Sequence, residues 1–279
     1  QLGAFSELEI LASMIRDYQR PVHLTFNSLF YLPEQYPEIA KIMKACMCLG
    51  FQSYIIADPA LILYLREHNI DCEIHLSGET GEVNSRMVDF FQQFSLKRVI
   101  FHRKSSFDDM KAVINAEKSY DGLRAETEFE AFILNEMCQF TGAFCNSLHC
   151  DELGHLCRIP YWLEPLKESC TGSSFRQLRP SVPAASSQTD VPNDSDLPEG
   201  YLCGATGCGL CALYRLREIG ITHLKLVGRG NYTDFMEQDI RMLRQALAIL
   251  ETSTSEKDFQ QNMREQLFPQ GCSSHCYYL

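Results

Sequence analysis

Short apolar segments alternate with amphipathic segments along most of the chain, and this alternation constrains the fold more than any other feature. Each apolar segment has the length and composition of a strand, and apolar residues at helical spacing follow it. Strands that alternate with helices indicate βαβ units and a parallel sheet. The six expected strands are residues 21–27, 53–58, 72–77, 98–102, 129–134 and 223–227.

Helices are expected between these strands and after the last one. Pro59 can open one of them, because the N–H that proline lacks has no partner in the first turn of a helix. The expected helices are residues 35–49, a helix opened by Pro59, residues 83–94, a helix from about Ser106, a helix after Cys211, and residues 231–252.

Polar residues stand at the ends of several expected strands: Asn27, Asp58, Ser77 and His102. In a (β/α) barrel the C-terminal ends of the strands form the mouth of the active site. The alternative is that these residues are polar only because loops are solvated. The expected fold class is therefore α/β, a TIM-barrel-like (β/α) parallel barrel that is incomplete at its N-terminus. Two further strands are expected before Gln1.

We expect residues 1–279 to form a single (β/α) barrel-like domain. The stretch 171–200 is rich in Pro, Ser, Asp and Asn and is expected to be a flexible loop. The C-terminal tail carries Cys272 and Cys276, which could cap a metal site, bind a second metal or have no role.

The charge balance argues against a protein that binds nucleic acid directly by itself. The formal net charge is −11, and nucleic-acid binding depends on patches of Lys and Arg, although a local basic groove stays open. No apolar run reaches the ~18 residues that span a bilayer, so we expect no membrane segment. The start of the chain does not resemble a signal peptide, which favours the cytoplasm.

Cysteines are concentrated in two short stretches. The chain has 13 cysteines, and seven of them are Cys138, Cys145, Cys150, Cys157, Cys203, Cys208 and Cys211. Thiolates are soft ligands that suit iron-sulfur clusters and zinc, so the clustering predicts a metal centre. Disulfides and buried apolar cysteines are the alternatives.

Several segments occur in an order that resembles a known family. They are the strands ending at Asn27 and Asp58, His75-Leu76-Ser77 followed by Asn84, Lys97-Arg98-Val99-Ile100, Glu130-Ala131-Phe132 before Cys138 and Cys145, Cys157-Arg158 with Tyr161, and Cys208 before Leu224-Lys225-Leu226 and Gly228-Arg229. Together they resemble the collagenase-like peptidase family (peptidase family U thirty-two), in particular its UbiU/UbiV type of iron-sulfur protein.

This resemblance implies a barrel that carries a 4Fe-4S cluster on Cys138, Cys145, Cys157 and Cys208. Cys150 is the alternative to Cys157, and Cys203 or Cys211 could replace another ligand. Zinc in a structural or interaction module is the alternative to the cluster.

The resemblance also implies oxygen-independent hydroxylation or modification of a small molecule or RNA base. It implies an anionic donor such as prephenate and pairing with a related hetero-subunit. The candidate catalytic residues are His75 and His102 as general acids or bases and Arg103 as a carboxylate-binding cation, with Lys225 and Arg229 as further cations. Structural histidines and ordinary ion pairs are the competing interpretations.

Three positions depart from the family pattern, which puts the substrate and the activity in question. His102-Arg103-Lys104 replaces Ser-Arg-Glu, Leu134 replaces a histidine, and Val227 replaces a glutamate. Peptidase activity is the alternative function. No Ser-His-Asp order and no His-Glu-x-x-His motif is recognisable in support of it.

Overall fold

Six parallel strands form one sheet in the order β1-β2-β3-β4-β5-β6 in the computed structural model of the chain. The structure describes residues 4–81, 84–119, 127–135, 202–228 and 233–278. These residues belong to one compact unit, formed by residues 1–146 and 202–279. The strands are β1 (Leu24–Phe26), β2 (Ser53–Ile56), β3 (Glu73–Leu76), β4 (Leu96–Ile100), β5 (Glu128–Leu134) and β6 (His223–Leu226).

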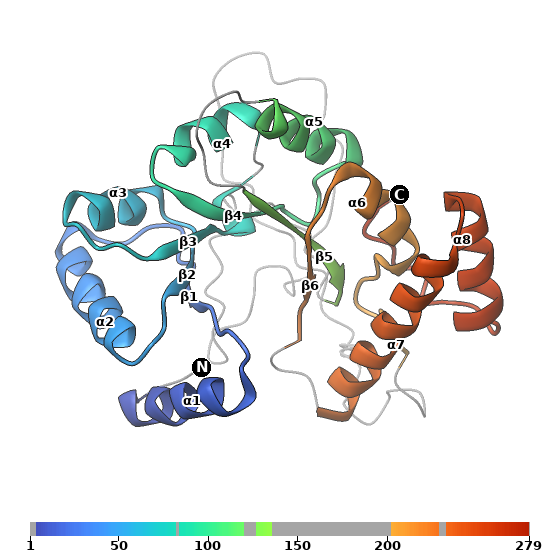
Figure 1. The fold of residues 1–279 in the computed structure, drawn as a ribbon, viewed down its shortest axis with the longest axis horizontal. Coiled ribbons are helices and arrows are strands. Elements are labelled where there is room, and N and C mark those ends of the chain that lie inside the picture. Colours follow the sequence, from blue (N-terminus) through green and yellow to red (C-terminus); the bar gives the residue numbers. More distant parts are fainter. Residues whose placement is uncertain (1–3, 82–83, 120–126, 136–201, 229–232, 279) are drawn as a thin grey trace, which may run out of the picture. The chain divides into compact units, whose positions relative to one another are not determined.

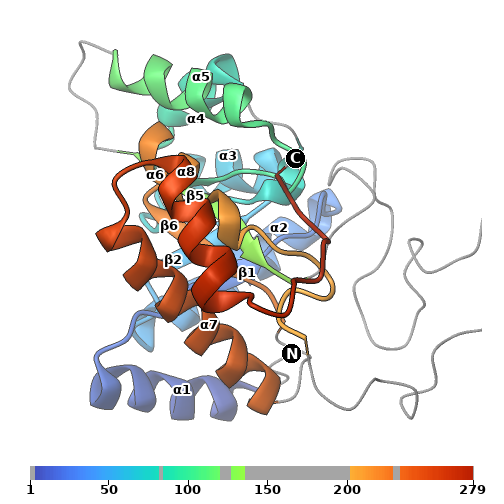
Figure 2. The ribbon, with the colours of Figure 1, turned by 90° about the vertical axis from the view of Figure 1, so that its right-hand side faces the viewer.

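The sheet curls, and the helices that connect its strands lie on its outer side (Figure 1). This arrangement confirms the expected α/β class and an incomplete, TIM-like barrel. From the side, α6, α7 and α8 lie in front of β5 and β6 (Figure 2). The helices are α1 (Phe5–Tyr18), α2 (Tyr36–Cys48), α3 (Pro59–Glu67), α4 (Ser85–Gln92), α5 (Phe107–Lys118), α6 (Leu213–Ile219), α7 (Thr233–Thr252) and α8 (Glu256–Asn262).

The two faces of the sheet differ in chemistry because successive side chains of a strand point to opposite sides. One set is apolar and packs under the helices: Tyr54 is fully buried, and its hydroxyl donates to the Met43 carbonyl of α2 at 3.1 Å. The opposite set, on the concave face, includes Glu73, His75, Arg98 and Glu130. The core therefore lies between the sheet and the outer helices, and the concave face carries polar groups.

Side-chain caps fix where several helices begin. Asp58 accepts a hydrogen bond from Ala60 N at 2.8 Å through Oδ1, and Pro59 occupies the first turn of α3 as expected. Oδ2 of Asp58 also accepts from the Tyr36 hydroxyl at 2.9 Å. Ser77 accepts from Glu79 N at 3.2 Å and caps a short turn. These two polar residues at strand ends thus serve the local backbone, as caps do.

Two helices were not expected from the sequence: α1, before the sheet, and α8, after α7. No helix among the described residues combines the length and the apolarity needed to cross a membrane. The stretch 171–200, expected to be a flexible loop, lies outside the described residues, and the limits of the domain stay a prediction.

Candidate functional site

A network of ion pairs occupies the concave face of β4, β5 and β6. Arg98 on β4 is buried and pairs with Glu128 at 2.7 Å and with Glu130 at 2.9 Å on β5. Lys225 on β6 pairs with Glu130 at 3.4 Å, and Lys97 pairs with Glu128 at 2.9 Å. Arg98 and Glu128 are register partners, so strand pairing itself brings these opposite charges together.

The electrostatics of Glu128 follow from this network. Burial by itself would raise the pKa of Glu128, but hydrogen bonds from Lys97 and Arg98 outweigh it, and the charge of Arg98 adds to their effect. The result is a pKa lowered to about 2, so the carboxylate is ionised at any physiological pH.

His75, one of the candidate catalytic residues, lies in β3 with a side chain that is fully buried. Its Nε2 is 2.8 Å from Glu73 Oε1. Burial is the main reason why the pKa of His75 falls to about 4, although the hydrogen bond to Glu73 raises it. His75 is therefore neutral near pH 7.

His102 and Arg103, the other two candidates, lie together just after β4. The Arg103 guanidinium pairs with Glu79 at 3.3 Å and lies 4.0 Å above the centroid of the Phe132 ring on β5. Lys225 lies over the same ring at 5.5 Å. Arg103 Nε is buried and has no hydrogen-bond partner among the described residues. Two cations thus converge on Phe132 at the C-terminal side of the sheet.

The hydrogen bonding of His102 indicates its tautomer. The side chain is buried, and its Nδ1 accepts a hydrogen bond from the backbone N–H of Lys104 at 3.2 Å. A neutral imidazole that accepts at Nδ1 carries its proton on Nε2. His102 therefore offers an N–H donor at Nε2.

Four thiols line one cavity of about 110 Å³ next to the end of β5. We call it the thiol cavity, and its cysteines are Cys208, Cys211, Cys272 and Cys276. The backbone holds it together: Cys208 N donates to the His275 carbonyl and Tyr277 N donates to the Cys208 carbonyl, both at 2.8 Å. The C-terminal tail is thereby fixed against Cys208.

Burial and neighbouring groups change the pKa of the Cys208 thiol. Burial raises its pKa, a hydrogen bond with the Leu210 backbone opposes that, and the other three thiols of the cavity raise it further, to about 12. Cys208 and the three thiols beside it form a donor set that a soft cation would convert to thiolates. The donor set of the thiol cavity therefore fits a thiolate-bound metal group.

The distances between these thiols indicate what kind of metal group they could hold. Among the described residues, no three cysteine sulfurs lie within 4.8 Å of one another. Sulfurs around a single tetrahedral zinc are about 3.8 Å apart, given a Zn–S bond of ~2.3 Å. The cavity is thus more open than a single zinc ion requires.

Cys203 does not belong to this cavity. It is buried, and burial together with the charge of Asp239, to which its thiol is hydrogen bonded, raises its pKa. Asp239 on α7 also accepts a hydrogen bond of 2.6 Å from Asn135, the residue that follows β5. Cys203 is thus part of a buried polar cluster that joins β5 to α7.

The last described residue, Tyr278, connects the thiol cavity to Phe132, the residue beneath Arg103. The Tyr278 hydroxyl donates to the Phe132 carbonyl at 2.7 Å, and Tyr278 lines the thiol cavity. Burial and the neighbouring Tyr277 raise the pKa of Tyr278, whereas the positive charge of Arg103 lowers it. Phe132 thus contacts the two cations through its ring and Tyr278 through its carbonyl.

The structure brings Cys208 and Arg103 into one region and leaves His75 apart. His75 is the register partner of Arg98 on β4. His102 comes four residues after Arg98, and four residues of extended chain span about 13 Å, so the two histidines lie at different levels along the strands. Cys138, Cys145, Cys150, Cys157 and Arg229 lie outside the described residues, so the predicted ligand set is described only at Cys208.

Sequence reasoning missed several residues of this region. Tyr278 and Asp239 carry no local pattern that separates them from tail or helix residues, and Phe132 entered only as part of the Glu130-Ala131-Phe132 segment. Tyr278 stands two residues after Cys276, and the Cys272/Cys276 pair was the one available signal for it. His23 and Glu73 were detectable only as polar residues at the beginning of expected strands.

Comparison with known proteins identifies relatives over most of the chain. The chain is 22% identical over 258 residues to tRNA hydroxylation protein P of Escherichia coli (strain K12), covering 81% of this chain and 54% of that protein. It is 21% identical over 238 residues to tRNA hydroxylation protein P1 of Bacillus subtilis (strain 168), covering 83% and 50%. The chain thus spans about half the length of the curated relatives it matches.

A solved structure, described as the structure of the U32 peptidase Mk0906, aligns with a TM-score of 0.39 and 14% identity. The alignment covers 48% of this chain and 53% of that one. The family model described as peptidase family U32 matches residues 3–279. Because that match extends over nearly the whole chain, the protein belongs to peptidase family U32.

Proposed function

We propose that this chain takes part in the oxygen-independent hydroxylation of a tRNA base and that it uses an iron-sulfur cluster. Family membership and relatives named tRNA hydroxylation protein support the reaction class. The thiol cavity beside the end of β5 is the observation that carries the proposal, because it provides soft ligands next to cationic side chains.

The proposed cluster ligands are Cys138, Cys145, Cys157 and Cys208. A bound 4Fe-4S cluster supplies one-electron chemistry. Cys208 supports this assignment, since it lines a cavity with three further thiols and its backbone is fixed on both sides by the C-terminal tail. Cys211, Cys272 and Cys276 would surround the cluster or replace one of its ligands. Zinc is the alternative group for the same thiols.

Arg103 is the proposed binding residue for an anionic oxygen donor such as prephenate. A guanidinium offers N–H donors in a planar fork that matches a carboxylate. Among the described residues Arg103 forms one ion pair, at 3.3 Å with Glu79, and its buried Nε has no hydrogen-bond partner there. Lys225, over the same Phe132 ring, adds a second positive charge.

His102 is the proposed hydrogen-bond donor next to Arg103. Its Nε2–H would donate a hydrogen bond to an oxygen of the bound donor, while the backbone N–H of Lys104 holds the ring by Nδ1. His75 stays a candidate acid or base from the sequence, but its position near Arg98 places it in a different part of the concave face.

A second chain is the proposed source of tRNA affinity. The net charge of −11 opposes contact with phosphates, and the basic groups Arg98 and Lys225 are occupied by Glu128 and Glu130. A related hetero-subunit that carries a basic surface would overcome this.

The test is expression in a bacterium from which tRNA hydroxylation protein P has been deleted, grown without oxygen. Mass spectrometry of digested tRNA should show the hydroxylated nucleoside with the wild-type chain and with Cys48→Ser, an exposed cysteine on α2. Cys208→Ser should not restore it. Absence of the nucleoside with a cluster-loaded wild-type chain would contradict the proposal, and metal-free cleavage of casein or collagen would favour the peptidase alternative.

A further inference from the structure

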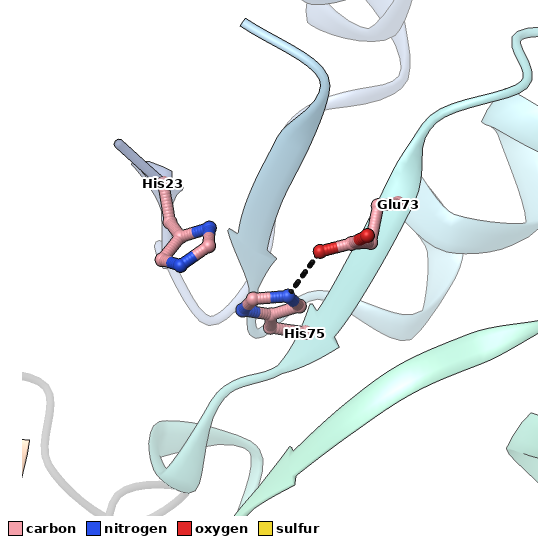
Figure 3. Close-up of side chains that lie close together, drawn as sticks. All are labelled: His23, Glu73 and His75. Carbon is pink, nitrogen blue, oxygen red and sulfur yellow. Dashed lines mark hydrogen bonds and ion pairs between the residues drawn. The ribbon is translucent and has the colours of Figure 1, made fainter. Parts of the chain in front are cut away.

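Three side chains of the types that bind metal ions meet on the concave face, over β1 and β3. His23 directly precedes β1, Glu73 opens β3, and His75 follows two residues later. Each offers one ligand atom, and these three atoms lie within 4.8 Å of one another. In Figure 3 the side chains of His23 and Glu73 extend toward the His75 ring.

The backbone, rather than a loop, brings the three residues together. Leu24, Tyr54 and Ile74 are register partners across β1, β2 and β3. The residues one position earlier, His23, Ser53 and Glu73, therefore form the neighbouring row. Their side chains point to the opposite face of the sheet. His75 shares that face with Glu73 because side chains two apart in a strand point the same way.

The hydrogen bonds within this cluster leave one ring nitrogen of each histidine available to a metal ion. His23 Nδ1 is hydrogen bonded to Ser53 Oγ, which leaves Nε2 of the same ring available. His75 is fully buried, and its Nδ1 has no hydrogen-bond partner among the described residues. A buried polar atom without a partner is rare in native proteins and calls for an explanation, such as an ion.

The groups at and around this cluster favour the binding of a cation. A neutral imidazole binds a metal ion through a ring-nitrogen lone pair, and both His23 and His75 offer such a ring. The nearest cation is Arg98, and it pairs with Glu128 and Glu130, which reduces its repulsion of a metal ion. Glu73 adds a negative charge at the cluster itself.

We propose that His23, Glu73 and His75 bind one divalent transition-metal ion, zinc or iron(II), through two imidazole nitrogens and a carboxylate oxygen. Two histidines with one carboxylate are a known donor set for both metals. With metal–ligand bonds of ~2.1 Å the ligand atoms would be about 3.4 Å apart, so small side-chain movements close the site. Ser53 holds the His23 ring by Nδ1, as outer partners of metal-ligating histidines do.

The ion links β1 to β3 across β2. β1 has only three residues, and among the described strands it pairs with β2 alone. His23 and Glu73 stand at the start of β1 and β3, and His75 is the third residue of β3, whereas Arg103 comes after the end of β4. The metal therefore holds the edge strand in place and is separate from the proposed cluster chemistry.

The test compares zinc or iron(II) bound per chain, after equilibrium dialysis of the anaerobically purified, cluster-loaded protein. Glu73→Gln and His23→Asn should each bind one equivalent less than the wild-type chain and keep the cluster absorbance. Glu67→Gln and His68→Asn, neighbouring exposed residues outside the site, should match wild type. Because every cysteine is retained, binding to thiols is equal in all variants.

A thermal melt gives a second readout that does not depend on stoichiometry. Added zinc should raise the melting temperature of the wild-type chain and of Glu67→Gln, but not that of Glu73→Gln. X-ray absorption should show nitrogen and oxygen neighbours for the equivalent that Glu73→Gln loses. Equal metal content in wild type, Glu73→Gln and His23→Asn would overturn the proposal, whatever the outcome of the tRNA assay.

Discussion

The amide of Asn135 donates a 2.6 Å hydrogen bond to the carboxylate of Asp239, although 104 residues separate the two in sequence. Both side chains are buried, and Asn135 also donates to the Val227 carbonyl at 3.1 Å. The contact fixes α7 to the end of β5. Asn135 is also the last described residue before the predicted cluster cysteines.

Replacement of Asp239 by Asn should therefore destabilise the fold. The variant places an amide N–H beside donors from Asn135 and Cys203, which leaves buried polar atoms without partners at a cost of about 1–3 kcal/mol. The free energy of unfolding in urea measures the loss. Asp234→Asn, an exposed position on the same helix, is the matched control and should change stability little. Equal stability of both variants would contradict a structural role for this contact.

Replacement of Cys208 by Ser should remove the iron-sulfur cluster. Protein purified without oxygen should contain about four iron and four sulfide per chain in wild type, as a 4Fe-4S cluster requires, besides any iron(II) at His23, Glu73 and His75, and much less of both in Cys208→Ser. Cys48→Ser should retain the wild-type content, since Cys48 is exposed on α2. Zinc in place of iron in the wild-type protein would end the cluster proposal.

Replacement of Gly204 by Ala should disturb Cys208 without any change to a thiol. A Cβ at position 204 would lie 2.7 Å from Cys208 Cβ, and the backbone has φ of +73°. Gly50→Ala is the control, because its φ is +105° but nothing lies within 4 Å of the added Cβ. Both variants carry backbone strain of about 1 kcal/mol, but only Gly204→Ala should lower the iron content. Equal iron content in both would show that Cys208 tolerates displacement.

Replacement of Arg103 by Lys should weaken binding of a carboxylate donor. Lysine keeps the charge but loses the planar fork, and a lost charged hydrogen bond of about 1.5–3 kcal/mol corresponds to a tenfold to hundredfold weaker binding. Calorimetric titration with prephenate measures the change. Arg86→Lys, on a side chain that is 91% exposed, should bind like wild type. Unchanged affinity in Arg103→Lys would remove Arg103 from the proposed donor site.

The stability of the protein should decrease at acidic pH through Glu128. Its pKa falls from the ordinary value of 4.5 to about 2, so its contribution is complete above pH 4.5 and is lost as the pH approaches 2. We expect Glu128→Gln to be less stable than wild type by about 2 kcal/mol at pH 6, after allowance for solvent screening. The difference should shrink toward pH 2 in urea unfolding experiments. A constant difference across this range would show that the ion pairs with Arg98 and Lys97 do not cause it.

Much of the fold was predictable from local pattern. All six expected strands are present, because short apolar runs between amphipathic segments leave a chain of this kind few alternatives to a parallel sheet. Pro59 opens α3 as predicted, since its constraint acts on its own backbone. Asp58 and Ser77, two of the polar residues at strand ends, cap α3 and a short turn, so their polarity has a local structural role.

The sequence by itself determined the strands, their parallel order and the presence of a thiol-rich region, because these depend on periodicity and residue type. Only the tertiary structure decided which distant residues meet. Strand register places His23 beside Glu73 and His75, and backbone pairing brings Cys276 to Cys208, 68 residues before it. Such contacts arise from the alignment of neighbouring segments in the folded sheet, which no single segment encodes.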